Sequence, residues 1–269
     1  MNFNYKTTKN NPASFQKVPD LSLIIVFKKT VKLIMNGEYI YSFNFFISQL
    51  INIVFGLIKS QKYFYCNLCK SKLSFFLHTS TSYKILFNSI CPNCSSRKRH
   101  RGLYELYREQ LKQYKSLKIL HFAPEPVFYD IFNSFDYIKA DLMLEDVDIK
   151  LDIENIDYED NSFDLILCNH VLEHVNNDKK ALEELKRILN PMGKVIITVP
   201  GNWKRKKTIE YIIPDRNGHY REYGLDYIKK LNTIFDKTES IDLYRYNKFY
   251  DLSLGLTPLH DIAFVCQKK

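Results

Sequence analysis

Four of the six cysteines stand in two short pairs, Cys66-x2-Cys69 and Cys91-x2-Cys94, with 21 residues between the pairs. Each C-x2-C turn can present two thiolates to one metal ion, and two such turns complete a tetrahedral site. Four sulfur ligands leave no open coordination position, so a site of this kind stabilises the fold and performs no chemistry. The spacing therefore predicts a structural zinc site, and the alternative is a redox-active pair.

A second group of polar residues follows an apolar run. Phe163–Cys168 is apolar on both faces and leads directly into Asn169 and His170. A helical pattern then covers Ala181–Leu189, and a second apolar run covers Val195–Val199. Such runs are typical of parallel strands covered by helices, whose carboxyl ends face the ligand crevice. We therefore expect Asn169 and His170 at a ligand site, with His170 as a candidate catalytic base or cofactor contact.

The elements that position these residues alternate along the chain. A helix over Arg101–Tyr114 precedes the first strand, and a helix over Leu225–Phe235 precedes the last two. The predicted strands are Leu117–Phe122, Tyr137–Ala140, Ile149–Leu151, Phe163–Cys168, Val195–Val199, Ser240–Tyr246 and Asp261–Cys266. This order predicts an α/β fold with a doubly wound, Rossmann-like, seven-stranded sheet. We expect residues 101–269 to form this domain, 61–100 a small zinc-binding module, and 1–60 a polar tail followed by apolar or amphipathic helices.

The stretch Tyr39–Ile58 is uncharged and long enough to be considered as a membrane span. Its polar residues fall largely on one side of a helical wheel, which favours an amphipathic helix that packs on the protein. Peripheral contact of residues 21–60 with a membrane surface is the alternative, because Lys28, Lys29, Lys32 and Lys59 lie nearby. The beginning of the sequence lacks the apolar core of a secretory signal, so we expect a cytoplasmic protein with reduced cysteines.

The chain carries a formal net charge of +9, from 39 Lys and Arg against 30 Asp and Glu. A basic balance can attract nucleic acid or anionic lipid. Lysine is frequent along the whole chain, however, so a general compositional bias is favoured. The densest basic runs are Arg97–Arg101 and Lys204–Lys207. The sequence gives no indication of the oligomeric state.

The run DNSFDLILCNHVLEHVNNDKKALEELKRILNPMGKVIITVP, from Asp160 to Pro200, closely resembles class I S-adenosylmethionine-dependent methyltransferases of the quinone-methylase-like branch. The resemblance covers roughly Leu117 to the last residue. The segment CPNCSSRKRHR resembles the zinc-bearing N-terminal part of a bacterial methyltransferase subgroup. In that subgroup Arg99, His100 and Arg101 are matched positions, and a basic, solvated helix start is the alternative interpretation.

The resemblance implies a set of cofactor-binding residues. The glycine-rich loop that usually follows the first strand is absent, since no glycine occurs between Gly102 and Gly193. Ala123 and two prolines replace it with an Ala-Pro-Glu segment that the zinc-bearing subgroup also shows. Glu125 would meet the cofactor's ammonium group, and His121 occupies the position of the usual acidic residue. Asp141, at the end of the second strand, would bind the ribose hydroxyls.

The resemblance also places Asp152 at the position that hydrogen-bonds adenine, with Ile153 beside the ring. On the acceptor side, the segment GHYREYG resembles the His-x-Arg segment of this branch, so His219 and Arg221 are candidate acceptor contacts. A turn cap for each Asp and a surface turn for GHYREYG are the structural alternatives. His170-Val-Leu-Glu173-His174 also spells H-x-x-E-H, an inverted zinc-protease motif that the surrounding spacing disfavours and for which no third ligand is apparent in the sequence.

The implied activity is methyl transfer from S-adenosylmethionine to a small molecule or glycan. An RNA methyltransferase is an alternative, because zinc modules also precede this fold in ribosomal RNA guanine methyltransferases. Against it, the cysteine spacing differs, and an Asn-Pro-Pro-Tyr type motif is absent. A catalytically silent scaffold is the third class, motivated by the altered cofactor loop.

Overall fold

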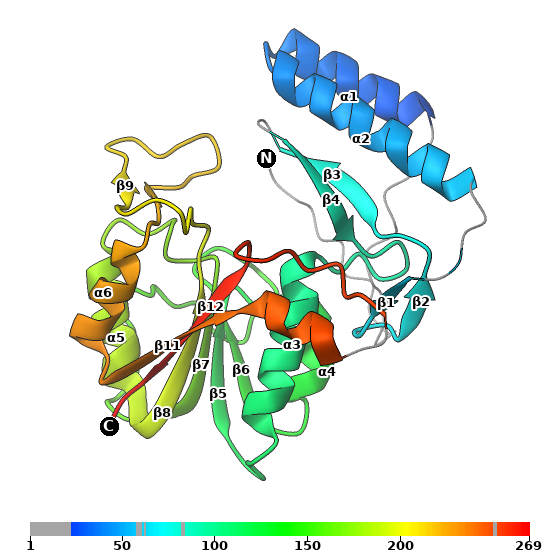
Figure 1. The fold of residues 1–269 in the computed structure, drawn as a ribbon. Helices are drawn as coiled ribbons and strands as arrows, with labels where there is room; N and C mark the ends of the chain where they lie inside the picture. The colour runs from blue at the N-terminus through cyan, green and yellow to red at the C-terminus, as the bar shows by residue number, and fades with distance from the viewer. Residues whose placement is uncertain (1–22, 58–60, 62, 82–83, 250–251) are drawn as a thin grey trace. The chain divides into compact units, whose positions relative to one another are not determined.

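The computed structural model describes residues 23–57, 61, 63–81, 84–249 and 252–269. The predicted polar tail and the residues Ile58 and Lys59 lie outside this part. The chain divides into two compact units, drawn in Figure 1. The N-terminal unit combines the chain up to Arg101 with Asn247–Leu256, and the sheet unit comprises Gly102–Tyr246 and Thr257–Lys269. The predicted helices and the predicted cysteine module thus share one unit.

The sheet unit contains a mixed six-stranded sheet. Its strands are β5 (Lys118–Phe122), β6 (Asp136–Ala140), β7 (Phe163–Asn169), β8 (Leu189–Thr198), β11 (Lys237–Asp242) and β12 (Ile262–Gln267). Their order is β11-β12-β8-β7-β5-β6. The four strands from β8 to β6 are parallel, and β12 is antiparallel to both of its neighbours. This arrangement confirms the predicted doubly wound α/β fold.

Six strands form where seven were expected. The segment predicted as a strand around Ile149–Leu151 makes only an isolated parallel bridge between Ala140 and Ile149. The chain before it, DLMLEDVD, is rich in acids, and the Asp148 carboxylate accepts a hydrogen bond from the Lys139 N–H at 2.8 Å. A side chain therefore takes a backbone donor that a longer strand would have paired.

The strand predicted over Ser240–Tyr246 also ends early, at Asp242. The Asp242 carboxylate accepts a hydrogen bond from the Tyr244 N–H at 3.0 Å, and a 3-10 helix, η2 (Leu243–Phe249), follows. An aspartate that bonds the backbone two residues on favours a turn over continued pairing.

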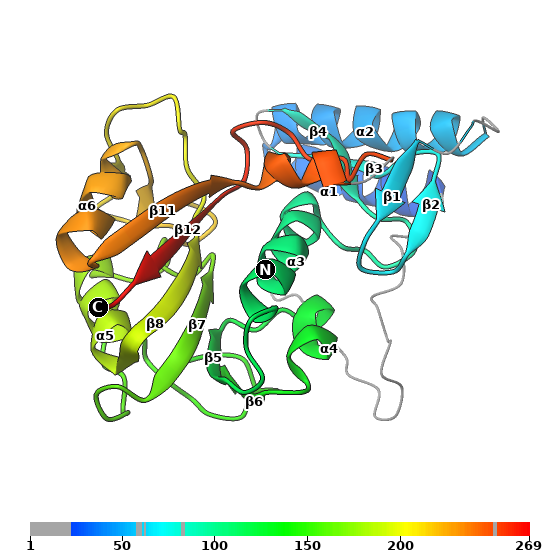
Figure 2. The same ribbon diagram turned by 60° about the horizontal axis from the view of Figure 1, so that its bottom comes forward.

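Helices cover both faces of the sheet (Figures 1 and 2). The helices α5 (Asp178–Ile188) and α6 (Asp226–Ile234) lie on one side, and α3 (Lys98–Leu111) and α4 (Tyr129–Phe132) lie on the other. The Asn177 side chain caps α5 by accepting a hydrogen bond from the Lys180 N–H at 3.0 Å. The buried face of α5 consists of Ala181, Leu182, Leu185 and Ile188, as the sequence pattern predicted.

The N-terminal unit contains two helices and two small hairpins. The helices are α1 (Leu23–Met35) and α2 (Tyr39–Leu57), and the hairpin strands are β1 (Phe64–Cys66), β2 (Ser71–Leu73), β3 (Leu77–Ser80) and β4 (Ile85–Ile90). A late segment of the chain completes this unit, because Ser253 forms a parallel bridge with Phe64.

The helix α2 is amphipathic as predicted, but the buried side is the polar one. Its buried residues are Ser42, Ser48, Gln49 and Asn52. The Asn52 amide donates to the His78 carbonyl at 2.9 Å and accepts from the His78 N–H at 2.7 Å. The apolar side is exposed, and Ile40 and Phe43, for example, are 68% and 66% exposed. The expectation that the apolar stripe packs on the protein is therefore wrong for the described residues.

Arg101 is fully buried in the N-terminal unit. Its guanidinium donates to the carbonyls of Leu254, Ser96 and Asn88 at 2.6, 2.9 and 3.0 Å, and it lies 3.7 Å from the centre of the Phe76 ring. A planar, five-donor group is suited to bridging several carbonyls in this way. The alternative interpretation, a solvated basic helix start, is wrong for Arg101, which holds three segments of the unit together.

Candidate functional site

The carboxyl ends of β5, β6, β7 and β8 meet at one edge of the sheet. Phe122 lies beside Ala140 of β6 and Cys168 of β7, and Asn169 lies beside Thr198 of β8. Because the strands are parallel and in this register, the segments that follow them emerge next to one another. This edge positions Ala123, Asp141 and His170, all predicted as site residues.

Two of these residues adopt the left-handed backbone conformation. Ala123 has φ of 49° and His170 has φ of 53°. For a residue with a Cβ this conformation costs about 1–2 kcal/mol. Hydrogen bonds hold both backbones, since the Ala123 N–H donates to the Ala140 carbonyl at 3.0 Å and the His170 N–H to the Thr198 carbonyl at 2.8 Å. Ala123 therefore makes, without glycine, the sharp turn that glycine usually allows after the first strand of such a sheet.

A buried polar network lies beneath this edge, on the side of the sheet covered by α3 and α4. The His121 imidazole is fully buried, with Nδ1 2.8 Å from the Tyr137 hydroxyl and Nε2 3.5 Å from the Asn169 amide nitrogen. The Asn169 amide donates to the Tyr107 hydroxyl at 2.7 Å and accepts from the Thr198 hydroxyl at 3.1 Å. The polar atoms of Asn169 are thus committed to the strand ends, which gives it a positioning role.

Burial lowers the pKa of His121 to about 4, and the nearby Glu125 carboxylate only partly opposes this shift. The imidazole is therefore neutral at physiological pH, since desolvation disfavours its charged form. His121 was predicted to take the place of the acidic cofactor contact. A neutral, buried ring bonded to Tyr137 is suited to a purely structural role at the end of the strand.

Asp141 and Asp152 are the predicted ribose and adenine contacts. One oxygen of each carboxylate already accepts hydrogen bonds from the backbone. Oδ1 of Asp141 accepts hydrogen bonds from the N–H groups of Met143 and Leu144 at 2.7 and 2.8 Å. Among the described residues, no hydrogen bond to Oδ2 of Asp141 is recorded, so this oxygen can accept from a ligand. Oδ1 of Asp152 accepts from the Glu154 N–H at 2.8 Å, while Ile153 is buried in the main core.

A cluster of histidines lies after β7. Nδ1 of His170 is 3.1 Å from Oε1 of Glu173, whose side chain is 1% exposed. Nε2 of His174 is 3.9 Å from the same oxygen, and the His174 and His219 rings are 4.8 Å apart. The sequence predicted His170 as a candidate base or cofactor contact and His219 as a candidate acceptor contact, and it singled out Glu173 and His174 only as part of a disfavoured motif. The structure brings all four together in one cluster.

Arg221 lies in the insertion after β8, in a short hairpin of β9 (Ile209–Glu210) and β10 (Arg221–Glu222). It is 3% exposed, and its guanidinium donates to the carbonyls of Leu172, Val175 and Asn176 at 2.7, 2.7 and 2.9 Å. It also pairs with Glu210 at 3.0 Å. Arg221 was predicted to contact the acceptor. Its donors are instead used to hold the turn that carries the histidine cluster, so we correct its role to positioning.

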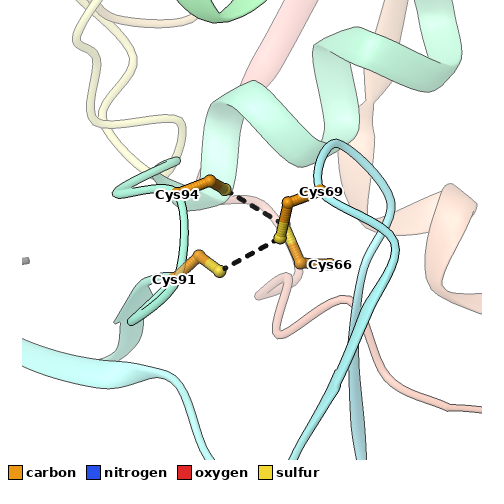
Figure 3. Close-up of side chains that lie close together, drawn as sticks. All are labelled: Cys66, Cys69, Cys91 and Cys94. Carbon is orange, nitrogen blue, oxygen red and sulfur yellow. Dashed lines mark hydrogen bonds between the residues drawn. The ribbon is translucent and has the colours of Figure 1, made fainter. Parts of the chain in front are cut away.

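The four cysteines of the N-terminal unit form a compact cluster, shown in Figure 3. Sγ of Cys66 is 3.6 Å from Sγ of Cys94, and Sγ of Cys69 is 3.7 Å from Sγ of Cys91. Four sulfurs at about 2.3 Å from one tetrahedral zinc ion lie about 3.8 Å apart. The observed distances therefore fit zinc. All four thiols are free of disulfide bonds.

Hydrogen bonds among the four cysteines shift the pKa values of their thiols in opposite directions. Bonds from the three other cysteines lower the pKa of Cys66, while bonds from Cys66 and Cys69 raise that of Cys91. Thiolates at such short distances repel one another, so a full set of four charges requires a cation between them. The donor set and its geometry are compatible with a structural zinc site.

Sequence reasoning did not identify Tyr107, Tyr137 and Thr198 as members of the buried network around His121 and Asn169. Tyr107 was predicted only as part of the buried face of a helix, and Tyr137 and Thr198 only as strand residues. A surface cavity of about 500 Å³ is lined by residues of α5 and α6 together with Lys268. It contains none of the predicted site residues, so the strand ends and not this cavity define the candidate site.

Residues 137–197 match the family described as Methyltransferase domain (Methyltransf_11). The matched segment begins in β6 and ends in β8, so it includes Asp141, Asp152, Asn169 and His170. Together with the observed α/β fold, this match supports a class I methyltransferase domain in the sheet unit. The match covers less than half of the chain.

Two relatives from Methanocaldococcus jannaschii have no described function. The uncharacterized protein MJ0638 is 40% identical over 80 residues, which are 27% of this chain and 35% of that protein. The uncharacterized protein MJ1123 is 30% identical over 112 residues, which are 36% of this chain and 55% of that protein. This chain therefore spans about a third to a half of the length of these relatives.

Solved structures show weak similarity. The 1,6-didemethyltoxoflavin-N1-methyltransferase of Burkholderia thailandensis is 14% identical, with a TM-score of 0.46, covering 64% of this chain and 78% of that one. The PH0226 protein of Pyrococcus horikoshii is 17% identical, with a TM-score of 0.45, covering 64% and 90%. At this level neither comparison supports an inference about substrate or mechanism.

The buried His121 predicts an acid-sensitive fold. Its pKa is about 4 in the folded protein and 6.5 in the unfolded chain. Below pH 6.5 the unfolded chain therefore takes up a proton that the folded protein does not. The contribution of His121 to the free energy of unfolding is therefore fully present above pH 6.5. As the pH falls toward 4, the free energy of unfolding decreases by up to about 3 kcal/mol.

Urea unfolding of the wild type and of His121→Gln at pH 7 and pH 4.5 measures this difference. We expect the variant to lose less stability on acidification than the wild type, by about 2 kcal/mol. His260→Asn, which changes a histidine outside the network, serves as the control and should behave as the wild type. Equal acid sensitivity in the wild type and His121→Gln would contradict the assignment.

Proposed function

We propose that the sheet unit is an S-adenosylmethionine-dependent methyltransferase of the quinone-methylase-like branch. The observation that carries the proposal is the methyltransferase-domain match over 137–197, because this segment ends β6 with Asp141 and ends β7 with Asn169 and His170 at one edge of the sheet. The proposed acceptor is a small molecule or a glycan. The proposal includes a cytoplasmic location, where the cysteine thiols stay reduced.

The residues at the strand ends fit the cofactor in chemistry and in placement. The left-handed turn at Ala123 brings the backbone close to the crevice, in the manner of the usual glycine loop. Oδ2 of Asp141 would accept hydrogen bonds from the ribose hydroxyls, and Asp152 would face the adenine amine. The Glu125 carboxylate would meet the ammonium group of the methionine moiety.

When bound, S-adenosylmethionine supplies the methyl group on a sulfonium that is a good leaving group. The protein's part is to align the acceptor and to remove its proton where the acceptor is a hydroxyl or an ammonium. His170 is the candidate base, because the Glu173 carboxylate at 3.1 Å from Nδ1 holds the ring and leaves Nε2 to accept a proton. His219 is the candidate contact on the acceptor side, since it lies in the same cluster.

We propose in addition that Cys66, Cys69, Cys91 and Cys94 bind a structural zinc ion. Among the described residues, the buried cluster around them consists of Cys66, Leu73, Phe76, Cys91 and Cys94. Because three of these five residues are cysteines, the apolar core alone is too small to stabilise this part of the unit, and metal binding supplies the remainder.

Cofactor binding can be tested at Asp141. In Asp141→Asn the side-chain oxygen can still cap the turn at Met143 and Leu144, but the second acceptor and the charge are lost. We expect the affinity for S-adenosylhomocysteine, measured by calorimetry, to fall about 10–100-fold, which corresponds to the loss of hydrogen bonds to a charged group. Asp146→Asn, an exposed acid of the same loop, should bind as the wild type does.

Two outcomes would contradict the proposal in different ways. Unchanged affinity in Asp141→Asn would remove Asp141 from the cofactor site while leaving the activity in place. Absence of binding to the wild-type, zinc-loaded protein would favour a catalytically silent scaffold.

The zinc site can be tested by cobalt substitution. Co²⁺ held by four thiolates shows intense sulfur-to-metal charge-transfer absorption, because sulfur donates electron density to the metal. We expect this absorption in the wild type and its loss in Cys91→Ser, together with a lower unfolding temperature. Cys266→Ala removes a buried cysteine outside the cluster and should keep the absorption. Retention of the full absorption in Cys91→Ser would exclude the four-sulfur site.

A further inference from the structure

We propose that Glu173, His174 and His219 form a second metal site, which binds a divalent transition-metal ion such as Zn²⁺. The three residues each offer one ligand atom, and these atoms lie within 4.8 Å of one another. Two imidazoles and one carboxylate are a ligand set found in zinc enzymes. The site lies in the sheet unit and is separate from the four cysteines.

The outer nitrogen of His174 has the hydrogen-bond partner expected of a metal ligand, and that of His219 lies near a carboxylate. Nδ1 of His174 lies 3.1 Å from the Gly218 carbonyl oxygen, so it carries the proton and donates it. Nε2 of His174 is then the unprotonated nitrogen and faces Glu173. Nδ1 of His219 lies 3.7 Å from a carboxylate oxygen of Asp215. Bonds of a histidine's other nitrogen to a carbonyl or a carboxylate orient metal-binding rings in many proteins.

The environment of the Glu173 carboxylate favours a bound cation. Its side chain is 1% exposed, and its Oε2 atom is buried without a hydrogen-bond partner among the described residues. A buried carboxylate with an unsatisfied oxygen is costly unless a charge or a donor compensates it. His170 contacts only the other oxygen, Oε1. A metal ion between Glu173, His174 and His219 would supply the missing partner.

The chain holds the two halves of this site together before any ion binds. Glu173 and His174 follow β7, whereas His219 lies in the insertion after β8. The Tyr220 N–H donates to the Glu173 carbonyl at 2.7 Å, and the buried Arg221 donates to three carbonyls of the turn at 172–176. The ligands are therefore preorganised by backbone contacts, as a tight metal site requires.

The ligand set differs from the inverted zinc-protease motif that the sequence spells. Nδ1 of His170, the first residue of that motif, is paired with Glu173, and the third ligand comes from a distant segment. Three protein ligands leave one position of a tetrahedral ion open. An acceptor hydroxyl bound there would lose its proton more readily, since a metal lowers the pKa of a coordinated oxygen. This last role rests on the proposed function, whereas metal binding does not.

Metal stoichiometry tests the site on the full chain. Metal-free protein is titrated with Zn²⁺ by calorimetry, and the bound metal is then counted. We expect two equivalents in the wild type and in the control variant His260→Asn, but one in His219→Asn and in Glu173→Gln. With Co²⁺, the charge-transfer absorption of the thiolate site should remain unchanged in both site variants, which shows that the lost equivalent belongs to the second site.

Each result decides the proposal. A single equivalent in the wild type, or two equivalents in both site variants, would overturn it. Titration of the same samples with S-adenosylhomocysteine separates this failure from a failure of the proposed function, because metal binding is measured without the cofactor.

A second and independent inference concerns the exposed side of α1 and α2. The helix α2 is the one described helix that is long and apolar enough to cross a membrane, with a mean hydropathy of 1.5, and 22% of it is buried. The two helices expose many large apolar side chains: Ile24, Ile25, Phe27, Val31, Ile34, Met35, Tyr39, Ile40, Phe43, Phe46, Leu50, Val54, Phe55 and Leu57. We call this set the apolar helix face. Exposed apolar side chains in such number on two neighbouring helices mark an interaction surface.

We infer that the apolar helix face binds the surface of an anionic membrane. Lys28, Lys29 and Lys32 on α1 are exposed beside it, while α2 carries no charged residue. Apolar side chains that enter the headgroup region, together with flanking lysines, are typical of helices that lie in the membrane interface. A spanning helix fits less well, because Asn52 and Ser42 of α2 form hydrogen bonds to His78 and to the Thr30 carbonyl within the unit.

Vesicle co-sedimentation of the full chain tests this inference. We expect binding to vesicles of phosphatidylglycerol and phosphatidylcholine, and at least about tenfold weaker binding to pure phosphatidylcholine, because each lysine near an anionic surface contributes about 1 kcal/mol. The double variant Phe43→Ser, Leu50→Ser should lose the binding. Met192→Ser, an exposed apolar residue of the sheet unit, should keep it.

Three results would overturn the inference. The first is no binding to either vesicle, and the second is unchanged binding of the double variant. The third is protein that high salt and carbonate fail to release, which would indicate a spanning helix.

Discussion

The arrangement of the sheet unit depends on one buried amide. Asn169 joins the ends of β5, β7 and β8 through its contacts with His121 and Thr198, and it reaches α3 through the Tyr107 hydroxyl. Buried polar groups need complete hydrogen bonding, so this network fixes both the register of the strand ends and the position of the helix above them. The loops that carry Ala123 and His170 start from this fixed base, and their left-handed backbones are tolerated because the strands below them do not move.

The same requirement explains the two arginines that were expected to have other roles. Arg101 and Arg221 are each buried, and each donates to three backbone carbonyls of neighbouring segments. A guanidinium satisfies three such carbonyls at once, which water cannot do in a closed interior. In the sequence, both residues occur in polar, charged segments and therefore look solvent-exposed. The carbonyl groups around an arginine decide whether it is buried. These groups come from other segments, so a local sequence pattern does not identify them.

Much of the fold could be predicted because its signals are local. The runs Phe163–Cys168 and Val195–Val199 are apolar on both faces, and the helix after Asn177 has a clear period, so all three elements are present in the structure. The strand β8 nevertheless begins earlier than predicted, at Leu189. The four cysteines were recognisable from spacing alone.

The predictions fail where side chains compete with backbone pairing, as Asp148 and Asp242 do, and where distant segments meet. The approach of His219 to Glu173, 46 positions away in the chain, is set by the β9–β10 hairpin and could not be read from a local pattern. The outward orientation of the apolar side of α2 was likewise invisible, because a helical wheel shows two faces but not which one the protein covers.

The late segment Asn247–Leu256 has a consequence for how the chain acquires its structure. It belongs to the N-terminal unit, where Ser253 pairs with Phe64 and the Leu254 carbonyl accepts from Arg101. During synthesis, the first hundred residues leave the ribosome long before these partners exist. The N-terminal unit therefore completes its folding only after almost the whole chain has been made, while the sheet unit, whose last strand is β12, finishes at about the same time. The usual order, in which the first unit of a chain folds before the next is synthesised, does not apply here. A fragment that ends at Arg101 therefore lacks the partners that Ser253 and Leu254 supply to this unit.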